Sequence, residues 1–131
     1  EDYFLDNQKI TLKEIGGDAD LDILDDFCSM YDWRPIKCKK GFNILDIQFE
    51  NQFVEEECFQ TFTELVNRIV GRAIDYFNNE MCWDEDDTES QLDYGYSLLK
   101  VGKKYVDKNN ENDIKWLDYF EKDLEELKKN N

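Results

Sequence analysis

Apolar and polar residues follow two different periods along the chain, and these periods predict its first elements. Residues 9–13 alternate between polar and apolar, which is typical of a half-buried strand, and Gly16 and Gly17 would end it. Apolar residues at helical spacing follow, so a helix is expected from Asp18, its cap, to about Tyr31. The first residues of that stretch also alternate, which leaves a strand open as the alternative there.

A β-hairpin is predicted next, with strands over 33–38 and 42–50 and a turn at Lys39-Lys40-Gly41. Pro35 indicates that the first of these strands lies at the sheet edge or begins there. The second strand alternates, and three of its apolar side chains are expected to face one way: Leu45, Ile47 and Phe49.

The period then becomes helical, which predicts a long helix from about 52 to 83 with Asn51 as its cap. Its broad apolar face is typical of a central, buried helix: Phe59, Phe62, Val66, Ile69, Val70, Ala73 and Phe77. Two further helices are expected over about 91–106 and 113–128. The core is predicted to include Leu117, Phe120 and Leu124 of the last helix.

These elements predict an α+β fold. A small antiparallel sheet, made of the hairpin at about 33–50 and the N-terminal strand, packs on the long central helix (about 52–83) and the two C-terminal helices. The length of 131 residues fits one domain, and no linker composition divides 1–131. A content of 40% hydrophobic and 15% aromatic residues is sufficient for a real core.

The net charge of the chain is the strongest indication of the kind of partner that it binds. The chain carries 32 acidic and 16 basic residues, a formal net charge of -16. A folded domain with this charge repels nucleic acid and anionic membranes and attracts basic protein surfaces. We therefore expect no direct nucleic-acid binding and no membrane association. Adaptation for solubility is the alternative explanation of the charge.

Histidine is absent, which removes the usual general base and the commonest metal ligand. Catalysis by Ser-His-Asp or Cys-His groups is therefore excluded as normally built. None of the glycines forms a phosphate-binding loop, and with so many acids no carboxylate pair stands out as catalytic. The sequence predicts a non-enzymatic protein without a cofactor.

A calcium site is not expected either. Asp18, Asp20 and Asp22 match the first positions of an EF-hand loop, but Ile23 replaces the turn glycine and Ser29 replaces the bidentate glutamate. The stretch from Asp84 fails in the same way. No dedicated metal site is predicted.

The four cysteines leave two readings open. No pair has the C-x-x-C spacing, and Cys28, Cys58 and Cys82 fall on apolar faces of predicted helices, which favours reduced, buried thiols. Two disulfides, in any of three connectivities, are the alternative. The first residue is Glu1 and not Met, so a removed leader is also left open. A cytoplasmic location is preferred, with secretion as the alternative.

The acids are concentrated in two blocks, and like charges placed together cost stability. Such blocks suggest surfaces aimed at a basic partner, with two solvated loops as the alternative. The first candidate contact surface is an acidic loop with the tryptophan before it: Trp83, Asp84, Glu85, Asp86, Asp87 and Glu89. The second is the acidic block at the start of the first predicted helix: Asp18, Asp20, Asp22, Asp25 and Asp26.

The function expected from this pattern is inhibition by occupancy. Carboxylates would stand in for phosphates on the basic surface of a nuclease or another nucleic-acid-handling protein. The setting would be a toxin–immunity pair or a DNA mimic of the anti-CRISPR type. The alternative is a secreted or structural interaction protein with disulfides, acidic for solubility.

Overall fold

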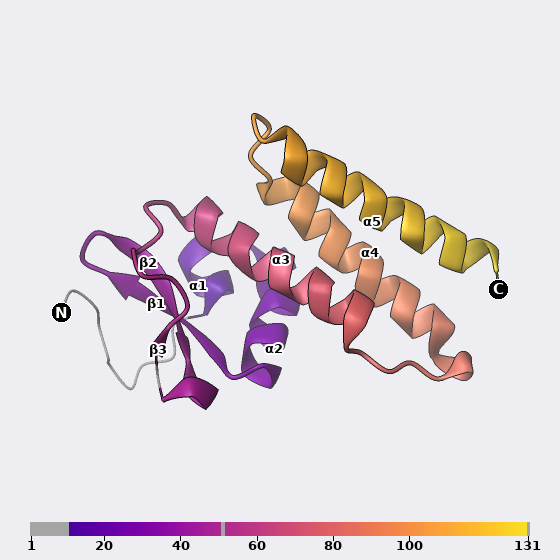
Figure 1. The fold of residues 1–131 in the computed structure, drawn as a ribbon, viewed down its shortest axis with the longest axis horizontal. Coiled ribbons are helices and arrows are strands. Elements are labelled where there is room, and N and C mark those ends of the chain that lie inside the picture. The colour runs from indigo at the N-terminus through magenta and orange to yellow at the C-terminus, as the bar shows by residue number, and fades with distance from the viewer. Residues whose placement is uncertain (1–10, 51, 131) are drawn as a thin grey trace. The chain divides into compact units, whose positions relative to one another are not determined.

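The computed structural model describes residues 11–50 and 52–130. It has an α+β fold in which the described residues form five α-helices and one three-stranded antiparallel sheet (Figure 1). The chain divides into two compact units, unit 1 ending at Ile69 and unit 2 beginning at Val70. This boundary falls inside the continuous helix α3 (Phe62–Asn79).

Unit 1 begins with α1 (Leu12–Gly16), where a strand was predicted. Thr11 caps the helix, since its side chain accepts a hydrogen bond from the backbone N–H of Glu14 at 3.1 Å. Gly17 ends it in the left-handed conformation with φ 61°, which glycine adopts at little cost. Local capping therefore overrides the alternating pattern at Leu12 and Lys13, and residues 9 and 10 lie outside the described part.

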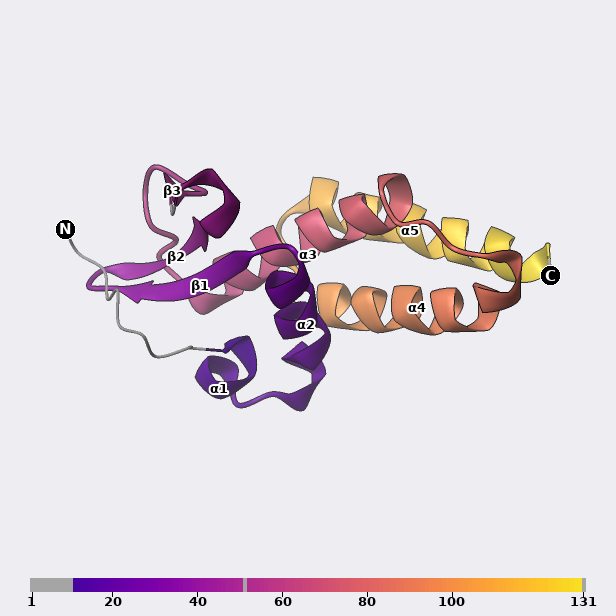
Figure 2. The ribbon, with the colours of Figure 1, turned by 90° about the horizontal axis from the view of Figure 1, so that it is seen from below.

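The predicted helix from Asp18 is confirmed in two pieces, the 3-10 turn η1 (Ala19–Leu21) and α2 (Asp22–Met30). Asp18 caps the first piece, because its side chain accepts a hydrogen bond from the backbone N–H of Asp20 at 3.0 Å. The inner face of these turns is buried as expected: Leu21, Leu24, Phe27 and Cys28. Figure 2 shows α1 and α2 together on one side of the hairpin.

The hairpin pairs β1 (Trp33–Cys38) with β2 (Gly41–Asp46), and β3 (Gln52–Phe53) pairs with the other side of β2. Pro35 lies in edge strand β1, as predicted. The second strand is shorter than expected, because Asp46 caps the 3-10 turn η2 (Ile47–Phe49) through a bond from the backbone N–H of Gln48. The prediction for this end of the strand was wrong.

Helix α3 starts ten residues later than the sequence predicted, at Phe62 and not at Gln52. Its start is a capping interaction, in which the side chain of Thr61 accepts from the backbone N–H of Glu64 and donates to its carboxylate. Residues 52–61 are held against the hairpin by the buried side chain of Asn43. Its Nδ2 donates to the carbonyl oxygen of Glu55 at 3.0 Å, and its Oδ1 accepts from the Glu55 N–H at 3.4 Å.

A close backbone contact at the hairpin turn requires glycine at position 41. Phe42 and Phe59 exchange backbone hydrogen bonds in an isolated bridge, which brings the chain alongside Gly41. Gly41 has φ 147°, and a Cβ there would overlap the carbonyl oxygen of Phe59. The tip of the hairpin is thus joined to the segment that leads into α3.

The core of unit 1 is formed by the hairpin, α1, α2 and the first half of α3. The ring of Phe62 is only partly buried, contrary to prediction, and meets Phe42 edge-on at 5.9 Å. The guanidinium group of Arg68 lies 5.6 Å from the centre of the buried Trp33 ring. The core side chains are Leu12, Leu21, Leu24, Phe27, Cys28, Trp33, Ile36, Cys38, Ile44, Leu45, Leu65, Val66 and Ile69.

Unit 2 contains the second half of α3, α4 (Thr88–Tyr105) and α5 (Glu111–Lys129), close to the predicted bounds. Helices α4 and α5 run side by side as an antiparallel hairpin (Figure 1). Its buried side chains are Val70, Ala73, Ile74, Phe77, Leu98, Leu99, Val101, Leu117, Phe120 and Leu124. Of the core predicted here, Ala73, Phe77, Leu117, Phe120 and Leu124 are confirmed.

Candidate functional site

The first candidate surface is the acidic turn of unit 2, defined as residues 84–89. A 3-10 turn and the start of a helix occupy this segment, where the sequence predicted a loop. Residues Glu85–Asp87 form the 3-10 turn η3, closed by a bond from the backbone N–H of Asp87 to the carbonyl oxygen of Asp84. Thr88 begins α4, so Glu89 lies in its first helical turn.

Four carboxylates of the acidic turn have no partner within the described part of the chain. The side chains of Asp84, Asp86, Asp87 and Glu89 are all exposed. Neither Asp84 nor Asp87 caps the turn or helix that follows it. No hydrogen bond or ion pair joins any of the four side chains to another described residue. Their charges face solvent and are not neutralised by contacts with other described residues.

Arg72, a cation on α3 in unit 2, already has acidic partners. Arg72 donates to Glu80 at 2.7 Å and to Asp75 at 3.4 Å, and both acids precede the acidic turn in the sequence. The N-terminal end of α4 carries partial positive charge, which offsets some of the repulsion in the turn. This offset is small beside several close negative charges. A basic group from outside would be attracted.

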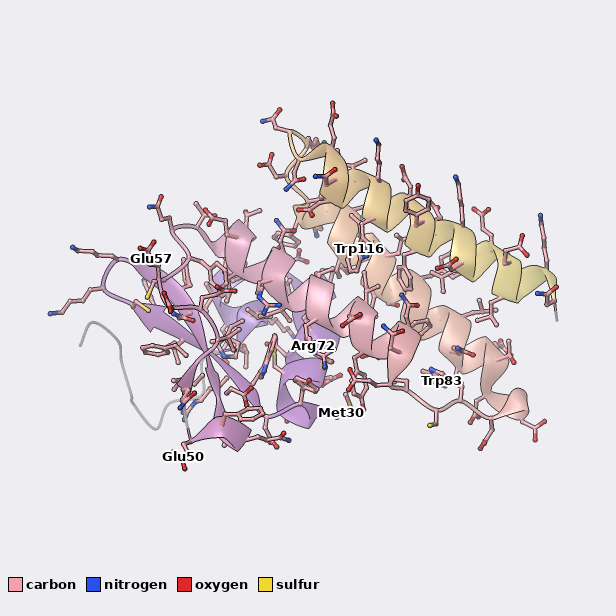
Figure 3. The ribbon with its side chains drawn as sticks, viewed as in Figure 1. Met30, Glu50, Glu57, Arg72, Trp83 and Trp116 are labelled. Atoms are coloured by element: carbon pink, nitrogen blue, oxygen red, sulfur yellow. The ribbon has the colours of Figure 1, made fainter. Side chains whose placement is uncertain are left out.

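Trp83 attaches the acidic turn to the helices of unit 2. Its ring centre lies 6.1 Å from that of Phe77 and 6.2 Å from that of Tyr94, and the side chain is half-buried (Figure 3). Its indole Nε1 is buried and has no hydrogen-bond partner among the described residues. The packing gives Trp83 a structural role as an anchor that holds the carboxylates of the turn close to a rigid core.

The second candidate surface, the Asp18–Asp26 block of unit 1, is used differently. Asp18 caps η1, and Asp22 lies 3.4 Å from the ammonium group of Lys13. Asp25 accepts hydrogen bonds from the backbone N–H groups of Leu12 and Lys13 at 2.7 and 3.1 Å. Burial raises the pKa of Asp25 above 3.8, and repulsion from its acidic neighbours adds to this, while the two backbone bonds oppose it. Three of the five acids of this block therefore take part in contacts within the fold.

Three acids of this block nevertheless line one surface depression of about 680 Å³. They are Asp18, Asp22 and Asp25, and Glu14 joins them, with Lys13 as the one cation in the lining. Asp20 and Asp26 are not part of it. A lysine or arginine side chain could enter this depression, but Lys13 already offsets part of its charge.

An exposed apolar group in unit 1 was missed by the sequence prediction. Ile47 and Phe49, expected to share one face of a strand with Leu45, are 47% and 64% exposed because η2 turns the chain out of the sheet. A bond from the backbone N–H of Ile47 to the carbonyl oxygen of Asp32 holds η2 beside the end of α2 (Figure 3). Met30 and Phe53 are also exposed. The available signal was Asp46, whose side chain favours a turn at this point.

Among the helices of the described residues, none combines the length and apolar character needed to cross a bilayer. No cluster of three or more potential metal ligands occurs within residues 11–50 and 52–130. No protein-family model, curated protein or solved structure matches this chain.

Proposed function

We propose that this protein is a non-enzymatic acidic inhibitor that binds the basic, nucleic-acid-binding surface of a partner protein. The observation that carries the proposal is the acidic turn, where four exposed carboxylates have no partner among the described residues. In the second block, by contrast, Asp25 and Asp18 form hydrogen bonds that the fold needs. The acidic turn therefore ranks first as the contact surface.

The mechanism is occupancy. A nucleic-acid-binding surface presents lysine and arginine side chains that neutralise phosphates. Carboxylates placed close together on a turn anchored by Trp83 can accept hydrogen bonds from the same side chains. The net charge of -16 accelerates the encounter with a basic surface, because long-range attraction steers association. The partner is then unable to bind its nucleic acid.

Two settings share this mechanism. An immunity protein would neutralise a toxin nuclease, and a DNA mimic would block a defence enzyme such as a CRISPR effector. In both, the bound carboxylates occupy positions that phosphates would otherwise fill. The two settings differ in how many basic residues of the partner protein are covered. Identification of the partner would distinguish them.

The test has two stages. The immobilised chain is first used to retain proteins from an extract of its native host at low salt, and the retained proteins are identified. Each is then bound to labelled DNA or RNA, and the free chain is added as competitor. We expect a basic protein that releases its nucleic acid, with association slowed by added salt. Retention of neutral or acidic proteins only, or undisturbed nucleic-acid binding, would overturn the proposal.

A further inference from the structure

Two cysteines that are distant in sequence meet at the tip of the hairpin in unit 1. Cys38 is the last residue of β1, and Cys58 precedes Phe59, which pairs with Phe42 on β2. The two Sγ atoms are 2.6 Å apart. We infer that Cys38 and Cys58 are a dithiol oxidation site, at which a reversible disulfide bond ties the β-hairpin to the segment that leads into α3.

Backbone pairing places both cysteines at the hairpin turn, with Cys38 opposite Gly41 and Cys58 next to the bridge between Phe42 and Phe59. Phe42 and Phe59 exchange backbone hydrogen bonds of 2.8 and 2.6 Å directly beside Cys58. Asn43, which is fully buried, binds the main chain of Glu55 and donates its Nδ2–H toward the Cys58 sulfur at 3.8 Å. A disulfide bond requires the two sulfur atoms to approach to about 2.0 Å, and the two Sγ atoms already lie 2.6 Å apart.

Burial gives the two sulfur atoms different access to reagents. Cys38 is 3% exposed and belongs to a small apolar cluster with Ile36 and Leu45. Cys58 packs against this cluster from outside and is partly exposed. Figure 3 labels Glu57, the residue before Cys58 in the segment that leads into α3. A small reagent therefore reaches Cys58 first and Cys38 second.

The other two cysteines serve as internal references. Cys28 is buried on α2, and burial raises its pKa to about 12, so its thiolate is scarce at neutral pH. Cys82 is exposed in the segment after α3. An exposed single thiol can accept a small-molecule adduct. Cys38 and Cys58 can instead form a disulfide bond with each other, because their two sulfur atoms are in contact.

The oxidant proposed is a low-molecular-weight disulfide, with oxidised glutathione as the probe. The Cys58 thiolate attacks one sulfur of this disulfide, a new S–S bond forms, and one glutathione thiolate leaves. The Cys38 thiolate then attacks the Cys58 sulfur and expels the second glutathione thiolate. The protein loses two electrons and two protons, and one oxidised glutathione becomes two reduced ones.

The test is peptide mapping of the native protein after incubation with oxidised glutathione at neutral pH. Remaining thiols are alkylated, the chain is digested without reductant, and linked peptides are identified. We expect one linked pair, Cys38 with Cys58, in the wild type and in the matched control Cys82→Ser, and none in Cys58→Ser. Because the bond closes a loop between positions 38 and 58, oxidation should raise the thermal midpoint by roughly 5–10 °C in the first two proteins only.

Three results would overturn the inference: alkylation of both Cys38 and Cys58 after oxidation, a stable glutathione adduct on Cys58 with Cys38 alkylated, or linkage of a different pair. The wild-type map alone decides the matter, so the test does not depend on the folding of Cys58→Ser. It is also independent of any binding partner.

Discussion

The carboxylate of Asp25 on α2 caps the first turn of α1, accepting a hydrogen bond from the backbone N–H of Leu12 at 2.7 Å. This contact separates the two acidic blocks by function. Asp25 joins α1 and α2. This contact partly buries the Asp25 carboxylate beside the negative charges of Asp22 and Asp26, which is unfavourable for its charged form. Four carboxylates of the acidic turn have no such role within the described residues: Asp84, Asp86, Asp87 and Glu89.

The first prediction concerns the pH dependence of stability. Because the folded-state pKa of Asp25 is raised above 3.8, mainly by burial, the folded protein holds its proton more tightly than the unfolded chain. The resulting stabilisation is complete below pH 3.8 and is lost as the pH rises through the raised pKa. In Asp25→Asn this titration is absent. Urea unfolding at several pH values should show the wild type losing stability relative to Asp25→Asn as the pH rises from 3.8 toward neutral.

The control for this prediction is Asp26→Asn, which removes the same charge from an exposed position on the same helix. Its stability relative to the wild type should change less over this range. Equal slopes for the two variants would mean that net charge, and not the burial of Asp25, sets the pH dependence.

The second prediction tests the register of the α4–α5 hairpin. Leu124 packs over Gly95 and Leu117 over Gly102, so a Cβ at Gly95 would lie 2.5 Å from a Leu124 methyl group. Gly95→Ala should therefore lower the unfolding free energy by about 1–3 kcal/mol. Gly71→Ala in α3 is the control, since no atom lies within 4 Å of a Cβ there. It should raise stability by about 0.5–1 kcal/mol through helix propensity, as measured by urea unfolding. Stabilisation by both substitutions would show that Leu124 does not pack on Gly95.

The third prediction compares two phenylalanines. Phe120 is 2% exposed and meets the Phe77 ring edge-on at 5.5 Å, whereas Phe49 on η2 is 64% exposed. Phe120→Ala should cost about 3–5 kcal/mol, and Phe49→Ala should change stability by no more than about 0.5 kcal/mol. Thermal unfolding of the two variants side by side measures the difference. A large loss of stability in Phe49→Ala would mean that the Phe49 side chain packs against the core.

Local signals accounted for much of the fold. Helical periodicity placed α4 and α5, and the hairpin and its edge proline followed from alternation and from Pro35. The acidic turn was also visible, because five carboxylates in six positions need no long-range information. The start of α3 could have been found from the Thr61 and Glu64 capping pair, which was overlooked.

Other features depend on contacts that no local pattern contains. Residues 52–61 carry apolar side chains at helical spacing, yet Asn43 binds Glu55 across twelve positions and keeps them beside the hairpin. The meeting of Cys38 and Cys58 is a consequence of the same long-range pairing. At α1, the carboxylate of Asp25 accepts hydrogen bonds from the backbone N–H groups of Leu12 and Lys13 across thirteen and twelve positions, and this contact supports a helix where alternation suggested a strand.

The fourth prediction is the most direct test of the proposed contact surface. The first variant changes four acids of the acidic turn to Asn or Gln: Asp84, Glu85, Asp86 and Asp87. The matched control neutralises four exposed acids of α5 in the same unit, Asp118, Asp123, Glu125 and Glu126, and so makes the same change in net charge. Both variants should fold as the wild type does, by circular dichroism and urea unfolding.

The decisive measurement is the affinity of these two variants for the partner protein recovered by capture, by titration calorimetry at fixed salt. If the acidic turn forms the contact, the turn variant loses at least ~2 kcal/mol of binding free energy, because several desolvated ion pairs are removed. The α5 control loses much less, since it weakens only long-range steering. Equal affinities for the turn variant and the wild type, or equal losses in both variants, would contradict the assignment of the acidic turn as the contact surface.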